Sequence, residues 1–251
     1  MSELPTKSMR IIDAHCHIGE GLTYSQTADE LLAKMDAHQV ESAVIVPADK
    51  FIAVYNAEGN DEVLAAAKEH PGRFIPFATA NPWYGDTALK ELERAFDLGA
   101  AGLKLHPPVQ GFQITDAIVF PLVELAVERG KPIYFHTGTA VCSSPYQLTE
   151  LAMRYPEGRF IMGHAAYADY WNDVICSTSA VPNIWIETSQ HLASFVCMLI
   201  RRFPDRVIYG SDAPRTDMGI EIQKITKFVD DADVLQRVFS GNLMRILGGV
   251  E

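Results

Sequence analysis

The stretch IIDAHCH at residues 11–17 carries an apolar run directly into two histidines spaced two apart. On an extended strand alternate side chains share a face, so we expect Asp13, His15 and His17 to point one way and Ala14 and Cys16 the other. Two imidazoles on one face of a rigid strand can bind one metal ion from the same side, and imidazole is a favoured ligand of zinc and its neighbours. This stretch therefore predicts a first strand that ends in a metal site.

A short β-rich run followed by an amphipathic helical run recurs along the whole chain. Eight such units in 251 residues predict an α/β fold, a single (β/α)8 TIM barrel treated as one domain over residues 1–251. A doubly wound open sheet is the alternative, but it more often carries a glycine-rich phosphate loop, which this sequence lacks. The expected strands are 10–18, 42–47, 73–80, 101–106, 131–136, 159–164, 183–189 and 206–212, and the expected helices lie near 28–39, 61–69, 89–96, 119–129, 146–154, 171–177, 193–203, 220–230 and 234–247.

Composition narrows the class of protein. The formal net charge of −11 argues against nucleic acid or an anionic membrane surface as partner. No apolar run approaches the roughly 20 residues that span a bilayer, and the first ten residues lack a signal-peptide core. The four cysteines show no CxxC spacing, which favours reduced thiols and a cytoplasmic location. A homodimer is the default expectation for oligomeric state, because dimers are the commonest oligomers.

Polar residues stand where the predicted strands end. In a (β/α)8 barrel the carboxyl ends of the strands carry the catalytic groups. Burying so many polar side chains together is costly unless they have a partner, and a metal ion supplies one. These residues are His15 and His17 after the first strand, Lys104 and His106 after the fourth, His136 after the fifth, His164 after the sixth and Asp212 after the eighth.

Six motifs in this order resemble the amidohydrolase superfamily of metal-dependent barrels. They are DAHCH at 13–17, GLKLHP at 102–107, FHTG at 135–138, GHAA at 163–166, YGSDAP at 209–214 and FSGNLMRILG at 239–248. The chain is most similar to the amidohydrolase-related (amidohydrolase 2) branch, which includes aminocarboxymuconate-semialdehyde decarboxylase. The resemblance runs through almost the whole sequence, and the order and spacing of the motifs are more specific than any one motif.

The resemblance implies that His15, His17, His136 and Asp212 bind one divalent metal, with zinc favoured, and that His164 transfers a proton or orients water nearby. The chemistry of the residues agrees, because three imidazoles and a carboxylate suit zinc better than calcium or magnesium. Zinc lowers the pKa of its bound water to about 7. Asp212 is expected both to touch the metal and to accept the proton from that water. Asp13 is expected either to hydrogen-bond a liganding imidazole or to cap the strand end.

Further residues are expected to contact the substrate. Lys104 and His106 share a strand face, and Arg215 lies where a cation can hold a substrate carboxylate. Some amidohydrolases carboxylate such a lysine to bridge two metals, but the KLHP pattern favours one metal per chain. The loops at 19–27, 49–59 and 107–114 are expected to frame the pocket. Trp83 and Tyr84 either wall it or cap the rim, whereas Glu187 and His191 are not assigned to the metal.

These residues favour a zinc-dependent hydrolase of a small amide, ester, lactone or cyclic substrate, and Arg215 makes an anionic substrate one of the expectations. Non-oxidative decarboxylation of an unsaturated or aromatic acid is the alternative, since fold and metal shell are shared between the two activities. A TatD-like deoxyribonuclease is a lesser alternative, because strand four offers GLKLHP in place of a liganding glutamate. A non-catalytic metal-binding barrel is disfavoured because no expected ligand is missing.

Overall fold

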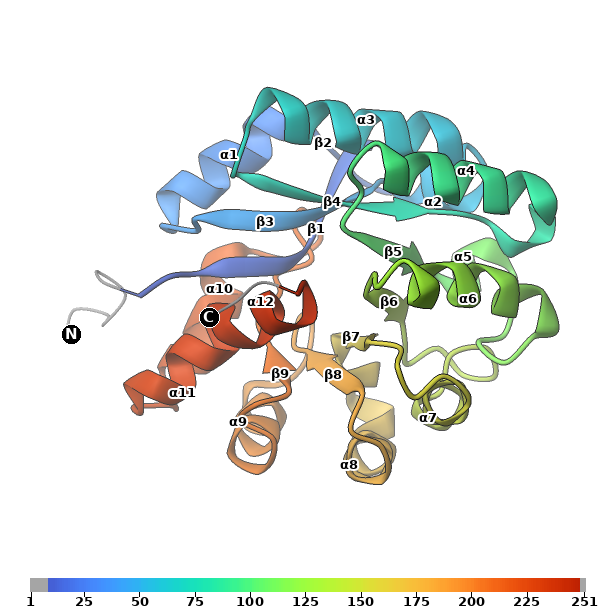
Figure 1. The fold of residues 1–251 in the computed structure, drawn as a ribbon. Coiled ribbons are helices and arrows are strands. Elements are labelled where there is room, and N and C mark those ends of the chain that lie inside the picture. Colours follow the sequence, from blue (N-terminus) through green and yellow to red (C-terminus); the bar gives the residue numbers. More distant parts are fainter. Residues whose placement is uncertain (1–8, 249–251) are drawn as a thin grey trace.

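The computed structural model describes residues 9–248. Nine strands form one curled sheet in the order β2-β1-β3-β4-β5-β6-β7-β8-β9, and every pairing is parallel except that of β2 with β1. Helices surround the strands on the outside (Figure 1). The strands are β1 (Ile12–Glu20), β2 (Ser25–Gln26), β3 (Ser42–Pro47), β4 (Phe74–Thr79), β5 (Gly102–Leu105), β6 (Ile133–His136), β7 (Phe160–Gly163), β8 (Ile184–Glu187) and β9 (Val207–Ile208).

The eight parallel strands make the predicted TIM barrel. Main-chain hydrogen bonds join the first strand to the segment after the last one. The N–H of Ala14 donates to the carbonyl of Tyr209 at 3.0 Å, that of Asp212 to His15 at 2.7 Å, and that of His17 to Ala213 at 2.7 Å. The two ends of the sheet therefore meet, and they meet at the histidines of the first strand.

The outer helices follow the predicted order with three differences. A short helix, α2, and the first turn of α3 occupy most of the segment expected as the loop 49–59, and α5 occupies part of the expected loop 107–114. The predicted helix at 234–247 is broken into α11, a π-helical turn and α12. The helices are α1 (Ala28–Ala37), α2 (Asp49–Ala53), α3 (Asn56–Glu69), α4 (Asp86–Asp97), α5 (Pro107–Gln110), α6 (Phe120–Glu128), α7 (Pro145–Arg154), α8 (Trp171–Ala180), α9 (Ala193–Arg202), α10 (Met218–Thr226), α11 (Ala232–Gln236) and α12 (Asn242–Ile246), with short turns η2 (Pro82–Tyr84), η3 (Ala117–Val119), η4 (His164–Ala166), η5 (Ala168–Tyr170) and η6 (Arg237–Gly241).

Local sequence explains how several helices begin. Thr27 caps α1 by accepting a hydrogen bond from the N–H of Glu30, whose carboxylate bonds back to the N–H of Thr27. Ser144 and Gln147 form the same reciprocal pair at α7. Such capping boxes satisfy N–H groups that the first helical turn leaves unpaired. Within residues 9–248, every helix is too short or too polar to cross a membrane.

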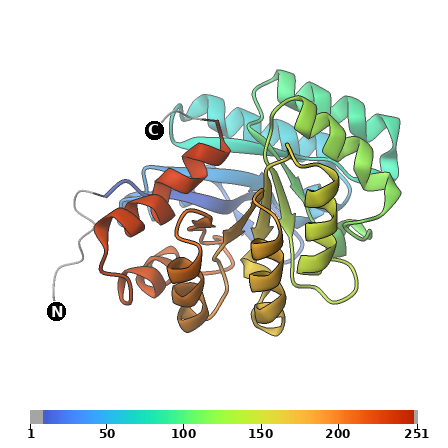
Figure 2. The ribbon, with the colours of Figure 1, turned by 60° about the horizontal axis from the view of Figure 1, so that its bottom comes forward.

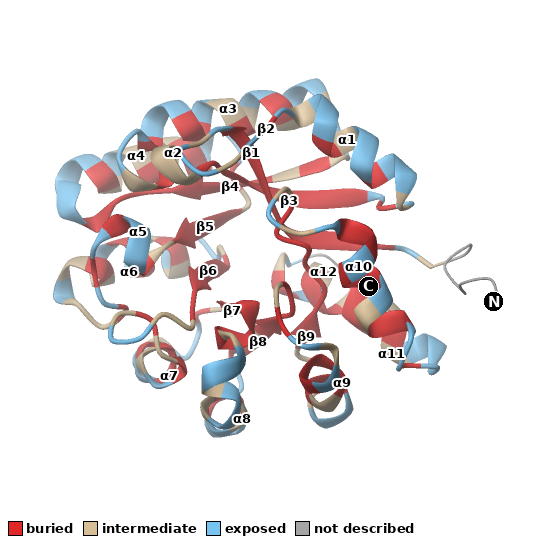
Figure 3. Cartoon of the chain, turned by 180° about the vertical axis from the view of Figure 1, so that it is seen from behind, coloured by how far each residue is buried: buried red, intermediate tan, exposed pale blue. Residues whose placement is uncertain are grey.

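The apolar residues form two layers. One lies between strands and helices, where the buried inner faces of the helices contrast with their exposed outer faces (Figure 3). The other fills the barrel, with Val44, Phe77 and Ile161 packed near Leu243 and Ile246 of α12. Residues at the starts of strands, such as Ile75, pack against the same cluster, so α12 lies toward the amino end of the barrel. Figure 2 shows the C-terminal helices running alongside the strands. The polar side chains therefore lie at the carboxyl end of the barrel.

A bulge in β1 changes which side chains face the interior. Asp13 pairs with Ala43 and Cys16 with Ile45, so three steps along β1 oppose two along β3. The extra residue places Ala14 and His15 together opposite Val44. Ala14 packs in the barrel interior while Cys16 packs in the outer layer. The expectation that Asp13 shares the face of His15 is therefore wrong, because the alternation on which it depends is interrupted between them.

Candidate metal centre

One pocket of about 230 Å³ opens at the carboxyl ends of the strands. Thr23, Tyr24, Asp49 and Val109 contribute to its wall, each from one of the segments 19–27, 49–59 and 107–114 that were expected to frame the pocket. Tyr167 also lines it, and nothing in the sequence had marked that residue. Every site residue predicted from the sequence also lines it. Those residues are His15, His17, Lys104, His106, His136, His164, Asp212 and Arg215.

Three donor atoms converge at the end of β1. Asp212 Oδ1 lies 3.1 Å from His17 Nε2 and 3.5 Å from His15 Nε2. All three side chains are buried, and within the described part of the chain Asp212 Oδ1 has no hydrogen-bond partner. A buried carboxylate oxygen without a hydrogen bond needs another partner, and a cation between the carboxylate and two imidazoles is one.

Hydrogen bonds to each imidazole ring decide which of its nitrogens is unprotonated and can bind a metal. His17 Nδ1 lies 2.9 Å from the carbonyl oxygen of Pro47, which can only accept, so Nδ1 carries the proton. The Tyr134 hydroxyl donates its proton to Glu187 and lies 2.9 Å from His15 Nδ1, so Nδ1 carries the proton and Nε2 the lone pair. Both rings therefore turn an unprotonated Nε2 toward Asp212, which is the form that binds a metal.

Asp212 owes its position to a turn that follows β9. Its φ of 57° lies in the left-handed region, which non-glycine residues seldom adopt outside constrained sites. The Gln190 amide donates to Oδ2, and Arg215 Nε lies 3.7 Å from the same oxygen. These contacts on Oδ2 leave Oδ1 facing the imidazoles. The sequence had given no sign of Gln190, since nothing local marks a residue whose partner is 22 positions away.

Three further imidazoles form a contiguous group. His136 Nδ1 lies 3.0 Å from His164 Nε2, and the rings of His106 and His136 stack with centroids 3.9 Å apart. Burial lowers the pKa of all three rings well below the usual value, so they are neutral at pH 7. Within residues 9–248 the nitrogens of His136 lie outside the two groups of donor atoms close enough to share an ion. Its place as a metal ligand stays a prediction.

Lys104 is entirely buried beneath the pocket floor. Its Nζ lies 3.8 Å from the centre of the Tyr134 ring as well as 3.0 Å from His15. Burial lowers the pKa of Lys104 to about 7, although the charges of Asp212 and Glu187 oppose that change. The amine is therefore a much weaker base here than on a protein surface.

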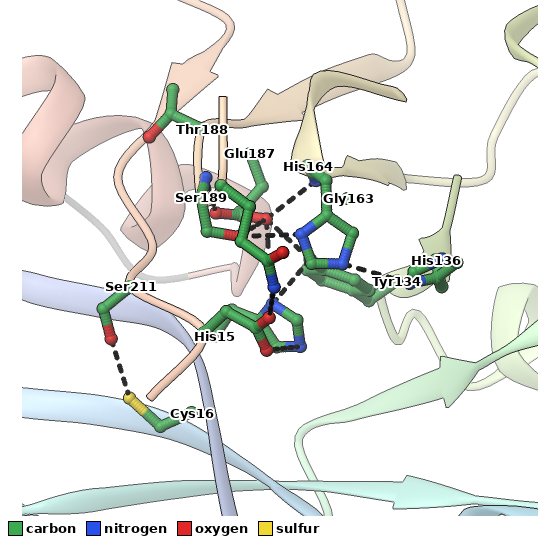
Figure 4. Close-up of polar contacts among 12 residues, drawn as sticks. His15, Cys16, Tyr134, His136, Gly163, His164, Glu187, Thr188, Ser189 and Ser211 are labelled. Carbon is green, nitrogen blue, oxygen red and sulfur yellow. Dashed lines mark hydrogen bonds and ion pairs between the residues drawn. The ribbon is translucent and has the colours of Figure 1, made fainter. Parts of the chain in front are cut away.

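Glu187 joins the site although the sequence had not assigned it. It ends β8 as His136 ends β6, so the strand-end rule that marked the other residues was available for it too. Its Oε2 lies 3.8 Å from His15 Nδ1, and these two residues with His164 form the second group of donor atoms close enough to hold an ion. Figure 4 shows the carboxylate between these two rings. Burial raises the pKa of Glu187.

Other predicted residues lie outside the pocket wall. Trp83 and Tyr84 are 62% and 42% exposed, with the Trp83 indole N–H donating to the Gly111 carbonyl at the rim. His191 stacks on Phe195. Asp13 accepts hydrogen bonds from the main-chain N–H groups of His15 and Ser211 and none from an imidazole. It therefore stabilises the junction of the first and last strands.

The whole described chain fits one family. A family model described as amidohydrolase matches residues 12–249. The chain belongs to the amidohydrolase family. Membership makes it one of a family of enzymes, and it accounts for the order of strand-end histidines around the pocket. No curated protein matches the chain.

Solved amidohydrolase-like structures share the fold at low sequence identity. The 5-carboxyvanillate decarboxylase of Sphingomonas paucimobilis superposes with a TM-score of 0.77 at 18% identity, covering 97% of this chain and 100% of that one. The 5-carboxyvanillate decarboxylase of Novosphingobium aromaticivorans, complexed with manganese, gives 0.77 at 16% identity and covers 96% of each chain. A probable 2-pyrone-4,6-dicarboxylic acid hydrolase of Acinetobacter baumannii gives 0.72 at 16% identity, with 96% and 100% covered.

The residues present fit a divalent cation. Two imidazole nitrogens and a carboxylate oxygen form a donor set suited to zinc or manganese, whereas calcium and magnesium prefer all-oxygen shells. The second group, around His15 Nδ1, fits less well, because the Tyr134 hydroxyl lies 2.9 Å from that nitrogen and 2.6 Å from Glu187 Oε2. That hydroxyl fills the space an ion needs. Of the two groups, the one around Asp212 is therefore the better fit for a cation.

Proposed function

We propose that this amidohydrolase is a zinc-dependent hydrolase of a small anionic substrate with an amide, ester or lactone bond. The observation that carries the proposal is the buried Asp212 Oδ1, which has no hydrogen bond in the described chain and faces the Nε2 atoms of His15 and His17. We propose one zinc per chain held by these three residues, with His136 as the fourth ligand.

The bound ion supplies Lewis acidity, which polarises a substrate oxygen and makes water a stronger acid. The chain's own residues supply the rest. Gln190 and Arg215 hold Asp212 Oδ2, and this oxygen lies at the pocket wall where it can accept a proton from the attacking water. Asp212 would then pass this proton to the ring of His164, which is neutral because burial lowers its pKa, and His164 would deliver the same proton to the leaving group.

The pocket wall supports an anionic substrate. The Arg215 side chain is 46% exposed and lies over the Tyr24 ring at 5.3 Å, so its guanidinium remains available to a carboxylate. His106 Nδ1 is buried, and within residues 9–248 it has no hydrogen-bond partner. We propose that a polar group of the substrate bonds to this nitrogen while Arg215 holds the carboxylate.

Decarboxylation of an aromatic or unsaturated acid is the second candidate. Two of the similar structures above are named as decarboxylases, and the Arg215 guanidinium and the Lys104 amine both line the pocket. In that reaction Arg215 would hold the carboxylate and His164 would protonate the carbon that loses it. The same residues serve both reactions, so substrate panels must distinguish them.

Metal analysis by mass spectrometry on protein purified without chelators is the first test. We expect about one zinc per chain, in keeping with a single structural or catalytic zinc site. It should be lost in Asp212→Asn and retained in Asp217→Asn, a matched change at the cap of α10. No metal in the wild-type protein after zinc or manganese supplementation would contradict the proposal. Turnover of lactones would then support hydrolysis. Carbon dioxide release from aromatic acids without turnover of lactones would instead support decarboxylation.

A further inference from the structure

The carboxylate of Glu187 is the meeting point of the hydrogen bonds behind the pocket (Figure 4). Its Oε2 accepts from the Tyr134 hydroxyl at 2.6 Å and the Ser189 hydroxyl at 3.0 Å. The same oxygen accepts from the main-chain N–H of His164, and Oε1 accepts from that of Ser189. Glu187 is fully buried and acts only as an acceptor, as an ionised carboxylate does.

Each of the two hydroxyls has a histidine on its other side. Tyr134 Oη lies 2.9 Å from His15 Nδ1, and Ser189 Oγ lies 2.9 Å from His164 Nδ1. Because each hydroxyl has committed its only proton to Glu187, it can only accept from the imidazole. Both rings must therefore carry their proton on Nδ1.

The barrel makes room for this arrangement. Tyr134 lies on β6 and Glu187 on β8, with β7 between them. Gly163 stands on β7 at the crossing point, and a Cβ there would lie 2.5 Å from the Tyr134 hydroxyl. A Cβ on Gly210 would likewise collide with Glu187 Oε1. The absence of two side chains lets the tyrosine reach across a strand to the carboxylate.

We infer that Glu187 is the shared positioning residue of the site, fixing the tautomer of His15 through Tyr134 and that of His164 through Ser189. The first branch turns the Nε2 lone pair of His15 toward Asp212 for metal binding. The second leaves His164 Nε2 unprotonated, where it accepts from His136 Nδ1 at 3.0 Å. One buried anion thus orients a metal ligand and a proton-transfer residue together. The effect of Glu187 on metal binding rests on the proposed function, whereas the two tautomers follow from the hydrogen bonds alone.

Two substitutions that each remove one hydroxyl oxygen test the effects of Glu187 on His15 and on His164 separately. Tyr134→Phe removes the hydroxyl next to His15, and Ser189→Ala removes the one next to His164. Tyr209→Phe and Ser177→Ala are matched controls, because both residues are fully buried and neither lies at the pocket. Within residues 9–248 the Ser177 hydroxyl has no hydrogen-bond partner, and that of Tyr209 donates a long bond, 3.4 Å, to the Met218 carbonyl.

Nitrogen NMR of metal-free, ¹⁵N-histidine-labelled protein reports which ring nitrogen carries each proton, independently of any activity. We expect His15 and His164 to be pure Nδ1–H tautomers in the wild type and in both controls. Tyr134→Phe should give a tautomer mixture at His15 alone, and Ser189→Ala at His164 alone. Unchanged tautomers in both variants would overturn the inference.

Zinc titration of the same proteins tests the consequence. Tyr134→Phe should raise the zinc dissociation constant by about 10- to 100-fold, the usual effect of removing a partner of a metal ligand. Ser189→Ala should change it by less than about fivefold, because Ser189 acts on the ion only through two residues, His164 and the proposed ligand His136. Equal zinc affinity in Tyr134→Phe and Tyr209→Phe would overturn the inference while leaving the proposed function intact. A wild type with the expected tautomers that binds neither zinc nor manganese would instead overturn the proposed function.

Discussion

Replacing Gly163 by alanine is the most direct test of how the site is packed. The backbone at Gly163 has φ −66° and ψ 144°, an extended conformation that alanine adopts freely. Only space therefore opposes the change. The added Cβ would lie 2.5 Å from the Tyr134 hydroxyl oxygen and 2.6 Å and 2.7 Å from two carbons of the ring.

The cost follows from how tightly Tyr134 is held. Restoring an ordinary contact of roughly 3.5 Å requires the ring to move by about 1 Å. Such a shift breaks the hydroxyl's bonds to His15 and Glu187, now 2.9 Å and 2.6 Å. Overpacking costs about 1–3 kcal/mol and each lost hydrogen bond about 1 kcal/mol, so we expect a loss of about 3–5 kcal/mol in the free energy of unfolding. For a chain of this size that lowers the melting temperature by roughly 10 °C.

Calorimetric melting of the metal-free protein measures this loss. Gly241→Ala is the matched control, because Gly241 has helical φ and ψ and its nearest neighbouring atom would lie 3.7 Å from a Cβ. Alanine there should leave stability unchanged or raise it by up to about 1 kcal/mol. A Gly163→Ala protein that melts together with this control would refute the reasoning, since it would mean that Tyr134 moves aside without cost.

Three further outcomes follow from the structure. Burial raises the pKa of Glu221 from 4.5 to about 7, so the folded state binds the carboxyl proton more tightly than the unfolded state. The protonated carboxyl group therefore contributes about 3 kcal/mol to the free energy of unfolding below pH 4.5, and this contribution is lost as the pH rises through 7. Urea denaturation at several pH values should show that loss in the wild type and not in Glu221→Gln. Arg215→Met should raise KM for a carboxylate substrate by about 10- to 100-fold, because one charge-assisted contact with the bound carboxylate is lost. The fall in kcat should be smaller, since the contact of Arg215 with Asp212 Oδ2 is long, at 3.7 Å; a fall in kcat alone would contradict a binding role. Thr27→Ala should cost about 1 kcal/mol in thermal or urea unfolding by removing the cap that bonds to Glu30, and no change in stability would show that the capping box contributes nothing.

The sequence determined the barrel and the composition of its pocket. Eight apolar runs separated by amphipathic stretches have few folds open to them, and parallel strands that close on themselves bring their carboxyl ends to one rim. The strand-end histidines, Lys104, Asp212 and Arg215 therefore line one pocket, as local pattern and strand direction predicted.

Only the tertiary structure decided how those side chains are oriented. The bulge that aims His15 inward depends on pairing with β3, and the left-handed turn at Asp212 depends on hydrogen bonding to the first strand. The place of Glu187 at the end of β8 could have marked it, but its partners could not be foreseen, because they come from β1, β6 and η4, which are distant from it in sequence. A periodic pattern specifies which face of an element is buried, but hydrogen bonds between distant elements depend on ångström-scale packing that no local pattern contains.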